Sequence, residues 1–181
     1  MKKPLGFWVA TWFGSGLLKD RLRIGGGTWG SLAAIPFCFA GIYLIKNTSI
    51  GTILILTWFF NLASVFVCGI FSVPVAEKML GQRKNWRGKL VKHDQSQIVI
   101  DEVWGMMITS TPLLFIQLHH SYWIAMTMVL VLFRIFDVVK LWPANAFDHW
   151  ENPYGVMLDD GAAGVYAAVV LTCIQKWIHQ F

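Results

Sequence analysis

Four long stretches without a charged residue dominate the pattern of hydrophobic and polar positions along this chain. They cover residues 24–45, 47–76, 103–133 and 161–175. A helix that spans a bilayer needs ~20 predominantly apolar residues, with a range of about 17–25. The pattern therefore predicts an all-α fold: an integral membrane bundle of about four short transmembrane helices, forming one domain over residues 1–181.

The stretches also predict where the helices lie. After the glycines at 25–27, residues 29–45 make a short first span, and residues 47–76 make a second with Pro74 close to its end. Residues 103–133 form either one long tilted helix or two short ones. The polar run at 119–121 lies at the midpoint of this stretch and favours two. Residues 161–178 make the last span, with Lys176 and Trp177 as interface anchors.

Composition agrees with a membrane protein. The chain is 56% hydrophobic and 14% charged, whereas soluble domains are about 25% charged. The net charge of +5 is modest for a nucleic-acid binder, and no basic–aromatic patch appears, so we expect no nucleic-acid partner. The three cysteines lie far apart without a CxxC spacing, which indicates neither a disulfide framework nor a zinc site.

The charges are concentrated in three segments. Residues 1–23, 77–102 and 134–160 hold 13 of the 15 lysines and arginines and all ten carboxylates. The positive-inside rule assigns these segments to the cytoplasmic side. Five acids mark the expected helix mouths on that side: Asp101, Glu102, Asp137, Asp159 and Asp160.

These acids allow two interpretations. Asp101–Glu102 and Asp159–Asp160 each precede or begin an expected helix, where acids stabilise the helix dipole. Both pairs together, with Asp137 and two cations on the same face, favour a site instead. Because the candidate ligands are hard carboxylate oxygens, the sequence indicates Mg²⁺, or Mn²⁺, rather than zinc.

Two further motifs suit a phosphorylated headgroup. Arg134, Asp137 and Lys140 are spaced by three on a helical continuation that Trp142-Pro143 ends, which gives either a salt-bridged surface helix or a cation–carboxylate–cation array facing phosphate. Residues 25–31 read GGGTWGS, so backbone N–H groups with the Thr28 and Ser31 hydroxyls could bind phosphate; the alternative is a glycine hinge capped by Thr28. Neither motif decides between its interpretations alone.

Several lipid-phosphate chemistries are excluded because their motifs are absent. The chain has no DxDxT/V nucleophile of haloacid-dehalogenase phosphatases, no CxxxxxR thiolate loop, and no DGxxAR pattern of CDP-alcohol phosphotransferases. The arginine–histidine set of type 2 phosphatidic acid phosphatases is missing too.

Five ordered blocks resemble the motifs of the phosphatidylglycerophosphatase A family. They are GSGL at 14–17, GTWGSLAA at 27–34, IVIDEVWG at 98–105, FRIFD with WP at 133–143, and GVMLDD at 155–160. The resemblance implies an all-helical, Mg²⁺-dependent phosphatase of the bacterial inner membrane. Such an enzyme converts phosphatidylglycerophosphate in the bilayer to phosphatidylglycerol at the cytoplasmic face.

The resemblance also suggests roles for individual residues. We expect a metal held by Glu102, Asp137, Asp159 and Asp160, with Asp101 as a fifth ligand or as a neighbour that contacts a ligand and not the metal. Arg134 and Lys140 would stabilise the transition state, and Asp94 would act as a base or orient one. Substrate contacts are expected from these residues: Ser15, Gly27, Thr28 and Ser31.

Two alternatives remain at this point. One is a phosphatase for another lipid phosphate, such as phosphatidic acid. The other is a non-enzymatic small transporter or membrane subunit, in which acids near mid-span would line an ion path.

Overall fold

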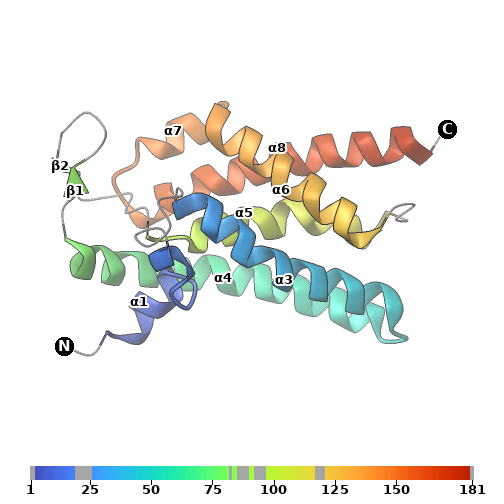
Figure 1. The fold of residues 1–181 in the computed structure, drawn as a ribbon, viewed down its shortest axis with the longest axis horizontal. Helices are drawn as coiled ribbons and strands as arrows, with labels where there is room; N and C mark the ends of the chain where they lie inside the picture. The colour runs from blue at the N-terminus through green and yellow to red at the C-terminus, as the bar shows by residue number, and fades with distance from the viewer. Residues whose placement is uncertain are drawn as a thin grey trace.

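Four long helices form the frame of the protein, which was analysed as a computed structural model (Figure 1). They are α3 (Gly26–Asn47), α4 (Gly51–Leu80), α6 (Tyr122–Val139) and α8 (Pro153–His179). The structure describes residues 3–18, 26–81, 83–84, 90–91, 97–116 and 121–179. The expected all-helical membrane architecture is confirmed in these residues.

Shorter elements complete the fold. Three are α-helices: α1 (Leu5–Ala10), α5 (Ile100–Ser110) and α7 (Ala144–Asp148). Two are 3₁₀ turns: η1 (Ser15–Leu17) and η2 (Thr111–Leu114). Within the described residues, strand structure is limited to an antiparallel pair, β1 (Arg83–Lys84) and β2 (Leu90–Val91).

Each long helix is apolar enough to cross a membrane. The spanning segments are Gly27–Asn47, Gly51–Leu80, Tyr122–Val139 and Pro153–Trp177. Helix α5 has 11 residues, or ~16 Å, which is about half the thickness of the hydrocarbon core. It is therefore an internal element of the bundle and not a fifth long span.

The interrupted third stretch is confirmed as two helices. Helix α5 continues into η2, which contains Pro112, and α6 begins at Tyr122. Ser121 is the N-cap of α6, where its hydroxyl accepts a hydrogen bond from the Trp123 amide at 3.3 Å. Because α6 runs back along the bundle, it ends at the same end of the bundle at which α5 begins (Figure 1).

Several expected helix bounds were too short. Helix α3 begins at Gly26 and not at residue 29, and α4 runs through Pro74 to Leu80. Helix α6 continues past Phe133 to Val139, as the expected helical continuation over Arg134 and Asp137 requires. Helix α8 begins at Pro153, eight residues before the expected position. The uncharged stretches mark only the part of each helix at hydrocarbon depth, whereas the helices extend into the interface, where charged side chains are tolerated.

The earlier start of α8 corrects one interpretation of the acids. Asp159 and Asp160 lie in the second turn of α8, and no acid lies in its first turn. The helix-dipole account therefore does not apply to this pair. It does apply to Asp101 and Glu102, which lie in the first turn of α5.

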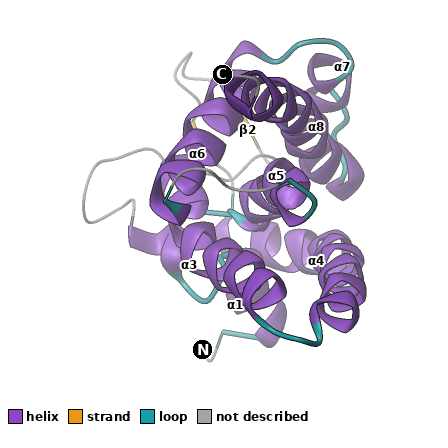
Figure 2. Ribbon diagram, turned by 90° about the vertical axis from the view of Figure 1, so that its right-hand side faces the viewer, coloured by secondary structure: helices purple, strands orange, loops and turns teal. Residues whose placement is uncertain are grey.

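Helix α5 forms the centre of the bundle (Figure 2). It contacts α3, α4, α6 and α8, and it approaches α8 especially closely. A Cβ atom added to Gly164 would lie 2.6 Å from the Gly105 carbonyl oxygen, and one added to Gly161 would overlap the Trp104 ring. Small residues thus let the α5 and α8 backbones touch, a common device in membrane bundles.

Five helix ends meet at one end of this bundle. Helices α3, α5 and α8 begin there, and α4 and α6 finish there, on the left of Figure 1. Segments far apart in the sequence are thereby brought together. The candidate site lies at this end, which we call the acidic end.

Candidate active site

Three carboxylates from two helices converge at the acidic end. Asp101 and Glu102 come from the first turn of α5, and Asp160 comes from the second turn of α8. One oxygen from each lies within 4.8 Å of the others, and Asp160 is 5% exposed. The close glycine-mediated packing of α5 on α8 brings these acids together. Among the described residues they form the group of acidic side chains able to hold a metal ion.

The oxygens of this group suit a divalent cation. Asp101 Oδ1 and Glu102 Oε2 are buried and have no hydrogen-bond partner. A buried carboxylate oxygen without a partner is costly, and a hard cation with oxygen ligands removes that cost. The residues present therefore fit a hard divalent cation that takes oxygen ligands.

Burial strongly perturbs the two acids of α5. Burial, together with the negative charge of Glu102, raises the pKa of Asp101 well above its usual range. Burial, with a smaller contribution from Asp160 and Asp137, raises the pKa of Glu102 to about 8. The two carboxyl groups also hydrogen-bond each other. Without a cation, this site therefore holds protons at neutral pH.

Helix α6 adds a cation and a fourth acid. Arg134 Nη1 lies 2.6 Å from Asp137 Oδ2, as the i,i+3 spacing predicts. Asp137 in turn is in hydrogen-bond contact with Asp160. Asp137 thus connects the Arg134 guanidinium to Asp160, a member of the acidic group.

The backbone of α3 closes the site on one side. A Cβ atom at Gly27 would lie 2.6 Å from Glu102 Oε1 and 2.8 Å from Arg134 Nη1. A Cβ atom at Gly30 would lie 3.2 Å from Glu102 Oε2. Glycine at position 27 therefore allows the start of α3 to lie directly against the carboxylate and the guanidinium.

Lys140 lies beyond the end of α6 and not on its face. It is the C-cap, with φ +46 in the left-handed region, and its side chain turns toward α7 and α8. Its Nζ donates to Asp159 Oδ2 at 2.9 Å and also bonds Asp148 Oδ1. Burial alone would lower the pKa of Lys140, but Asp159 and Asp148 outweigh it and hold that pKa above its usual value. The expected three-charge array is thus split into an Arg134–Asp137 pair and a separate lysine cluster.

Asp159 has its partners within this lysine cluster. One of its oxygens accepts from Lys140 and the other from the Asp160 amide at 2.9 Å. It lies outside the group of Asp101, Glu102 and Asp160, whose oxygens lie within 4.8 Å of one another. Sequence reasoning missed Asp148. Its only signal was its place in the charged segment 134–160, which does not distinguish it from Glu151.

The expected substrate-binding residues have different surroundings. Gly27 lies at the site, and Thr28 follows it in the first turn of α3. The Ser31 hydroxyl is buried and donates to the Gly27 carbonyl at 2.9 Å, and the Ser15 hydroxyl donates to the Thr11 carbonyl at 3.3 Å. Both serines thus bond to nearby backbone. Asp94, the expected base, lies outside the described residues.

Comparison with known proteins identifies the family. A sequence profile described as Phosphatidylglycerophosphatase A matches residues 8–175. The chain is 31% identical to "Phosphatidylglycerophosphatase A" of Haemophilus influenzae, over 94% of this chain and 88% of that protein. It is 34% identical to the protein of the same name from Escherichia coli, over 90% of this chain and 79% of that protein. The chain belongs to the phosphatidylglycerophosphatase A family.

Other comparisons refine this result. The chain is also 30% identical to a "Putative phosphatidylinositol-3-phosphatase" of Bacteroides thetaiotaomicron, over 98% of this chain and 99% of that protein. No solved structure matches the chain at a significant level. As a member of the phosphatidylglycerophosphatase A family, the protein is a membrane phosphomonoesterase whose substrate is a lipid phosphate.

Proposed function

We propose that this protein hydrolyses phosphatidylglycerophosphate to phosphatidylglycerol and phosphate, with Mg²⁺ or Mn²⁺ as cofactor, at the cytoplasmic face of the bacterial inner membrane. The observation that carries the proposal is the convergence of Asp101, Glu102 and Asp160 within 4.8 Å at one end of a membrane bundle. Membership of the phosphatidylglycerophosphatase A family supports the substrate. The concentration of lysines and arginines in segments 1–23, 77–102 and 134–160 supports the orientation.

Asp101, Glu102 and Asp160 would hold the cation, and Asp137 adjoins them through Asp160. Bound there, a divalent cation would supply positive charge to the phosphoryl group and make a water molecule more acidic. The acidic group and its neighbours contain six acids, which are Asp101, Glu102, Asp137, Asp148, Asp159 and Asp160, and two cations, Arg134 and Lys140. This excess of acids over cations favours the binding of a further positive charge, such as a metal ion, at the acidic end.

Arg134 and Lys140 would bind the phosphate from two sides. Arg134 is oriented by Asp137, and its remaining N–H groups can donate to phosphate oxygens. Lys140 is oriented by Asp159 and Asp148. Because phosphoryl transfer depends mainly on positioning and electrostatic stabilisation, two fixed cations are well suited to it.

Asp101 and Glu102 also suit proton transfer. A carboxyl group is most effective as a general acid or base when its pKa lies near the working pH, and burial raises the pKa of Glu102 to about 8. The shared hydrogen bond allows one of the pair to carry a proton while the other is ionised. Asp94 remains a further candidate base.

A second lipid phosphate is the specific alternative. The relative named "Putative phosphatidylinositol-3-phosphatase" aligns with nearly the whole chain, which favours phosphatidylinositol 3-phosphate as the competing substrate, and phosphatidic acid shares the same chemistry. An ion path is disfavoured because the acids gather at one end of the bundle and not along its middle.

The test is phosphate release by the purified protein in detergent micelles. Phosphatidylglycerophosphate, phosphatidic acid and phosphatidylinositol 3-phosphate are compared, each with EDTA, Mg²⁺ or Mn²⁺. We expect the highest kcat/KM with phosphatidylglycerophosphate and no turnover in EDTA. A higher kcat/KM with another lipid would reject the substrate, and full activity in EDTA would reject the cofactor.

A further inference from the structure

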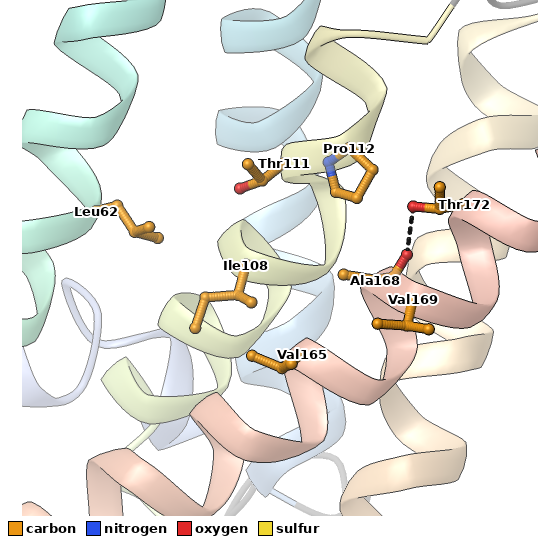
Figure 3. A pocket seen from close by; sticks show the side chains of 8 residues that line it. All are labelled: Leu62, Ile108, Thr111, Pro112, Val165, Ala168, Val169 and Thr172. Atoms are coloured by element: carbon orange, nitrogen blue, oxygen red, sulfur yellow. Dashed lines mark hydrogen bonds between the residues drawn. The ribbon is translucent and has the colours of Figure 1, made fainter.

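An apolar groove opens between α4 and α8, with α5 as its floor (Figure 3). Leu62 of α4 lies on one side, the segment from Ile108 to Pro112 of α5 and η2 forms the floor, and Val165 to Thr172 of α8 form the other side. The volume is about 300 Å³. The part of α5 before Ile108, which includes Asp101 and Glu102, lies on the site side of this groove.

The lining offers a ligand no free polar group. None of the described residues that line the groove is charged. Its two hydroxyl groups are used by their own helices: Thr111 donates to the Met107 carbonyl at 2.8 Å, and Thr172 donates to the Ala168 carbonyl at 2.7 Å. The chemistry of the groove therefore selects hydrocarbon.

The groove faces the bilayer and not an aqueous space. Helices α4 and α8 are both membrane-spanning segments by length and composition. Val165 and Val169, on the α8 side, are more than half exposed, so the groove opens sideways to lipid. A lipid chain could enter it without leaving the membrane.

The groove lies at the depth of an acyl chain relative to the acids. Ile108 is six residues beyond Glu102 on α5, or ~9 Å, and Val165 is five residues beyond Asp160 on α8, or ~8 Å. Thr172 is twelve residues beyond Asp160, or ~18 Å. One leaflet of the hydrocarbon core is ~15 Å thick. A lipid whose phosphate lies at the acidic end would therefore place a chain along the groove.

Trp104 forms a boundary between the groove and the acids. It lies one turn before Ile108 on α5, and its Nε1 donates to the Leu62 carbonyl at 2.9 Å. Its ring packs against Phe66 of α4, with centroids 4.8 Å apart, and against Gly161 of α8. These contacts fix α4 against α5 at the end of the groove nearest to the acids.

We propose that this groove binds one acyl chain of the lipid phosphate whose headgroup occupies the acidic end. The proposal rests on the proposed function for the identity of that headgroup. It extends that function by assigning the recognition of the lipid tail to α4, α5 and α8. An enzyme built in this way distinguishes long-chain from short-chain substrates, because only the former fill the groove.

The first experiment fills the groove. Ala168→Phe places a ring among its lining residues, and Ala40→Phe makes the same change at an exposed position on α3. We expect Ala168→Phe to lower kcat/KM at least tenfold for a dioleoyl lipid phosphate and less than twofold for the dihexanoyl form. Ala40→Phe should leave both values within twofold of wild type. An equal effect of Ala168→Phe on both substrates would overturn the proposal.

The second experiment uses the wild-type protein and does not depend on turnover. A phosphatidic acid with a diazirine at the end of one acyl chain is photolysed with the protein, and the labelled peptides are mapped. Label concentrated in residues 108–112 and 165–172 supports the proposal. Label distributed evenly over α3, α4 and α6 overturns it, as does equal labelling of the groove by the matching phosphatidylcholine, which would make it a site for bulk lipid.

These outcomes are separable from failure of the proposed function. Groove labelling by phosphatidic acid without phosphate release from any lipid would reject the enzymatic substrate and retain the groove. Phosphate release without groove labelling would reject the groove alone. Protection of the groove by a second copy of the chain in a cross-linked dimer would also overturn the proposal.

Discussion

Glu102 lies against the backbone of a neighbouring helix at a place where a side chain would not fit. Its Oε1 atom would be 2.6 Å from a Cβ atom at Gly27. Its Oε2 atom is buried and has no hydrogen-bond partner, whereas the carboxyl group as a whole shares a hydrogen bond with Asp101. Each of these features depends on an individual residue, so each can be tested by a single substitution.

Replacing Gly27 by alanine should separate activity from helix stability. Alanine is favoured over glycine within a helix by about 1 kcal/mol, but the new methyl group would displace Glu102 and Arg134. We expect kcat/KM to fall at least tenfold while the thermal midpoint in detergent changes little. Gly6→Ala, whose Cβ would lie 3.3 Å from the Val75 side chain, is the control. Unchanged activity in Gly27→Ala would show that α3 does not constrain the site.

Replacing Asp160 by asparagine should stop catalysis without unfolding the protein. The substitution keeps the size of a nearly buried side chain but removes one charge from the proposed metal group. We expect turnover to fall at least ~10²-fold, the size typical of losing one electrostatic contact to the transition state. Phosphate release and gel-filtration profiles would measure the two properties. Glu151→Gln, at an exposed acid outside the group, should retain wild-type turnover, and wild-type turnover in Asp160→Asn would remove it from the ligand set.

The raised pKa of Glu102 predicts opposite pH trends with and without metal. Its usual pKa is about 4.3, and burial raises it to about 8 in the folded protein. Between these values the folded state holds a proton that the unfolded chain has lost, so metal-free stability should fall as pH rises. Cation binding requires loss of that proton, so Mg²⁺ affinity should rise over the same interval.

Thermal unfolding in detergent between pH 5 and pH 8.5 checks this expectation. In EDTA the midpoint should decrease with pH, and the stabilisation added by Mg²⁺ should increase. Glu102→Gln removes the titrating group and should weaken both trends. A midpoint independent of pH in EDTA would contradict the assigned protonation.

At the scale of elements, the contact between α5 and α8 controls the geometry of the site. Gly105, Gly161 and Gly164 allow these helices to touch, and the helices carry all three members of the acidic group. Small changes in their separation would therefore alter the distances among Asp101, Glu102 and Asp160. Helix packing and cation binding are coupled in this region.

Gly164→Leu tests the coupling. Its Cβ would lie 2.6 Å from the Gly105 carbonyl oxygen, a backbone atom that cannot move without shifting α5. We expect a loss of about 1–3 kcal/mol in unfolding free energy, as for overpacked cores, together with weaker Mg²⁺ binding. Chemical unfolding in detergent and metal titration would measure both. Ala40→Leu, at an exposed position, should change neither; normal stability in Gly164→Leu would show that the helices are not tightly packed.

The positions of the long helices were predictable because stretches without charged residues mark the parts of the chain at hydrocarbon depth. The absence of charges located α3, α4, α6 and α8, because charged side chains are costly at hydrocarbon depth. The same signal failed at helix ends such as Pro153, since helices continue through the interface. It also did not distinguish the 11-residue α5 from a span, because a helix buried among other helices is as apolar as one facing lipid.

Site residues were predictable as a set but not in their pairings. Asp101, Glu102 and Asp160 were recognisable as candidates because they border uncharged stretches of the chain. The left-handed backbone at Lys140 was not, and this local conformation turns the lysine toward Asp159 and Asp148 and away from the Arg134–Asp137 pair. Such pairings depend on the geometry of a turn, which residue spacing does not encode.

At the scale of the whole molecule, the bundle has two chemically different ends. One end carries the acids, Arg134 and Lys140. The other carries the turn between α3 and α4 and the start of α6 at Tyr122 (Figure 1). These ends are separated by the uncharged lengths of four membrane-spanning segments.

Cysteine labelling should assign the two ends to opposite sides of the membrane. With the native cysteines replaced, we expect Thr48→Cys and Ser121→Cys to react with an impermeant maleimide added outside intact cells. Gly81→Cys and Glu151→Cys should react only in inverted vesicles, because the positive-inside rule assigns the acidic end to the cytoplasm. Labelling of all four from one side would contradict the orientation.

Lys46, near the end of α3, bonds the carbonyl oxygen of Ile116 at 2.7 Å, just beyond η2. Ile116 lies beyond the ends of both α5 and η2, and the ammonium group of Lys46 thus ties this segment to α3. The positive charge of Lys46 also opposes the proposed orientation, because it lies at the end of the bundle that the positive-inside rule assigns to the outside. Removing it to favour correct insertion would take this hydrogen-bond donor from a part-buried carbonyl group, so biogenesis and folding place conflicting demands on a single side chain.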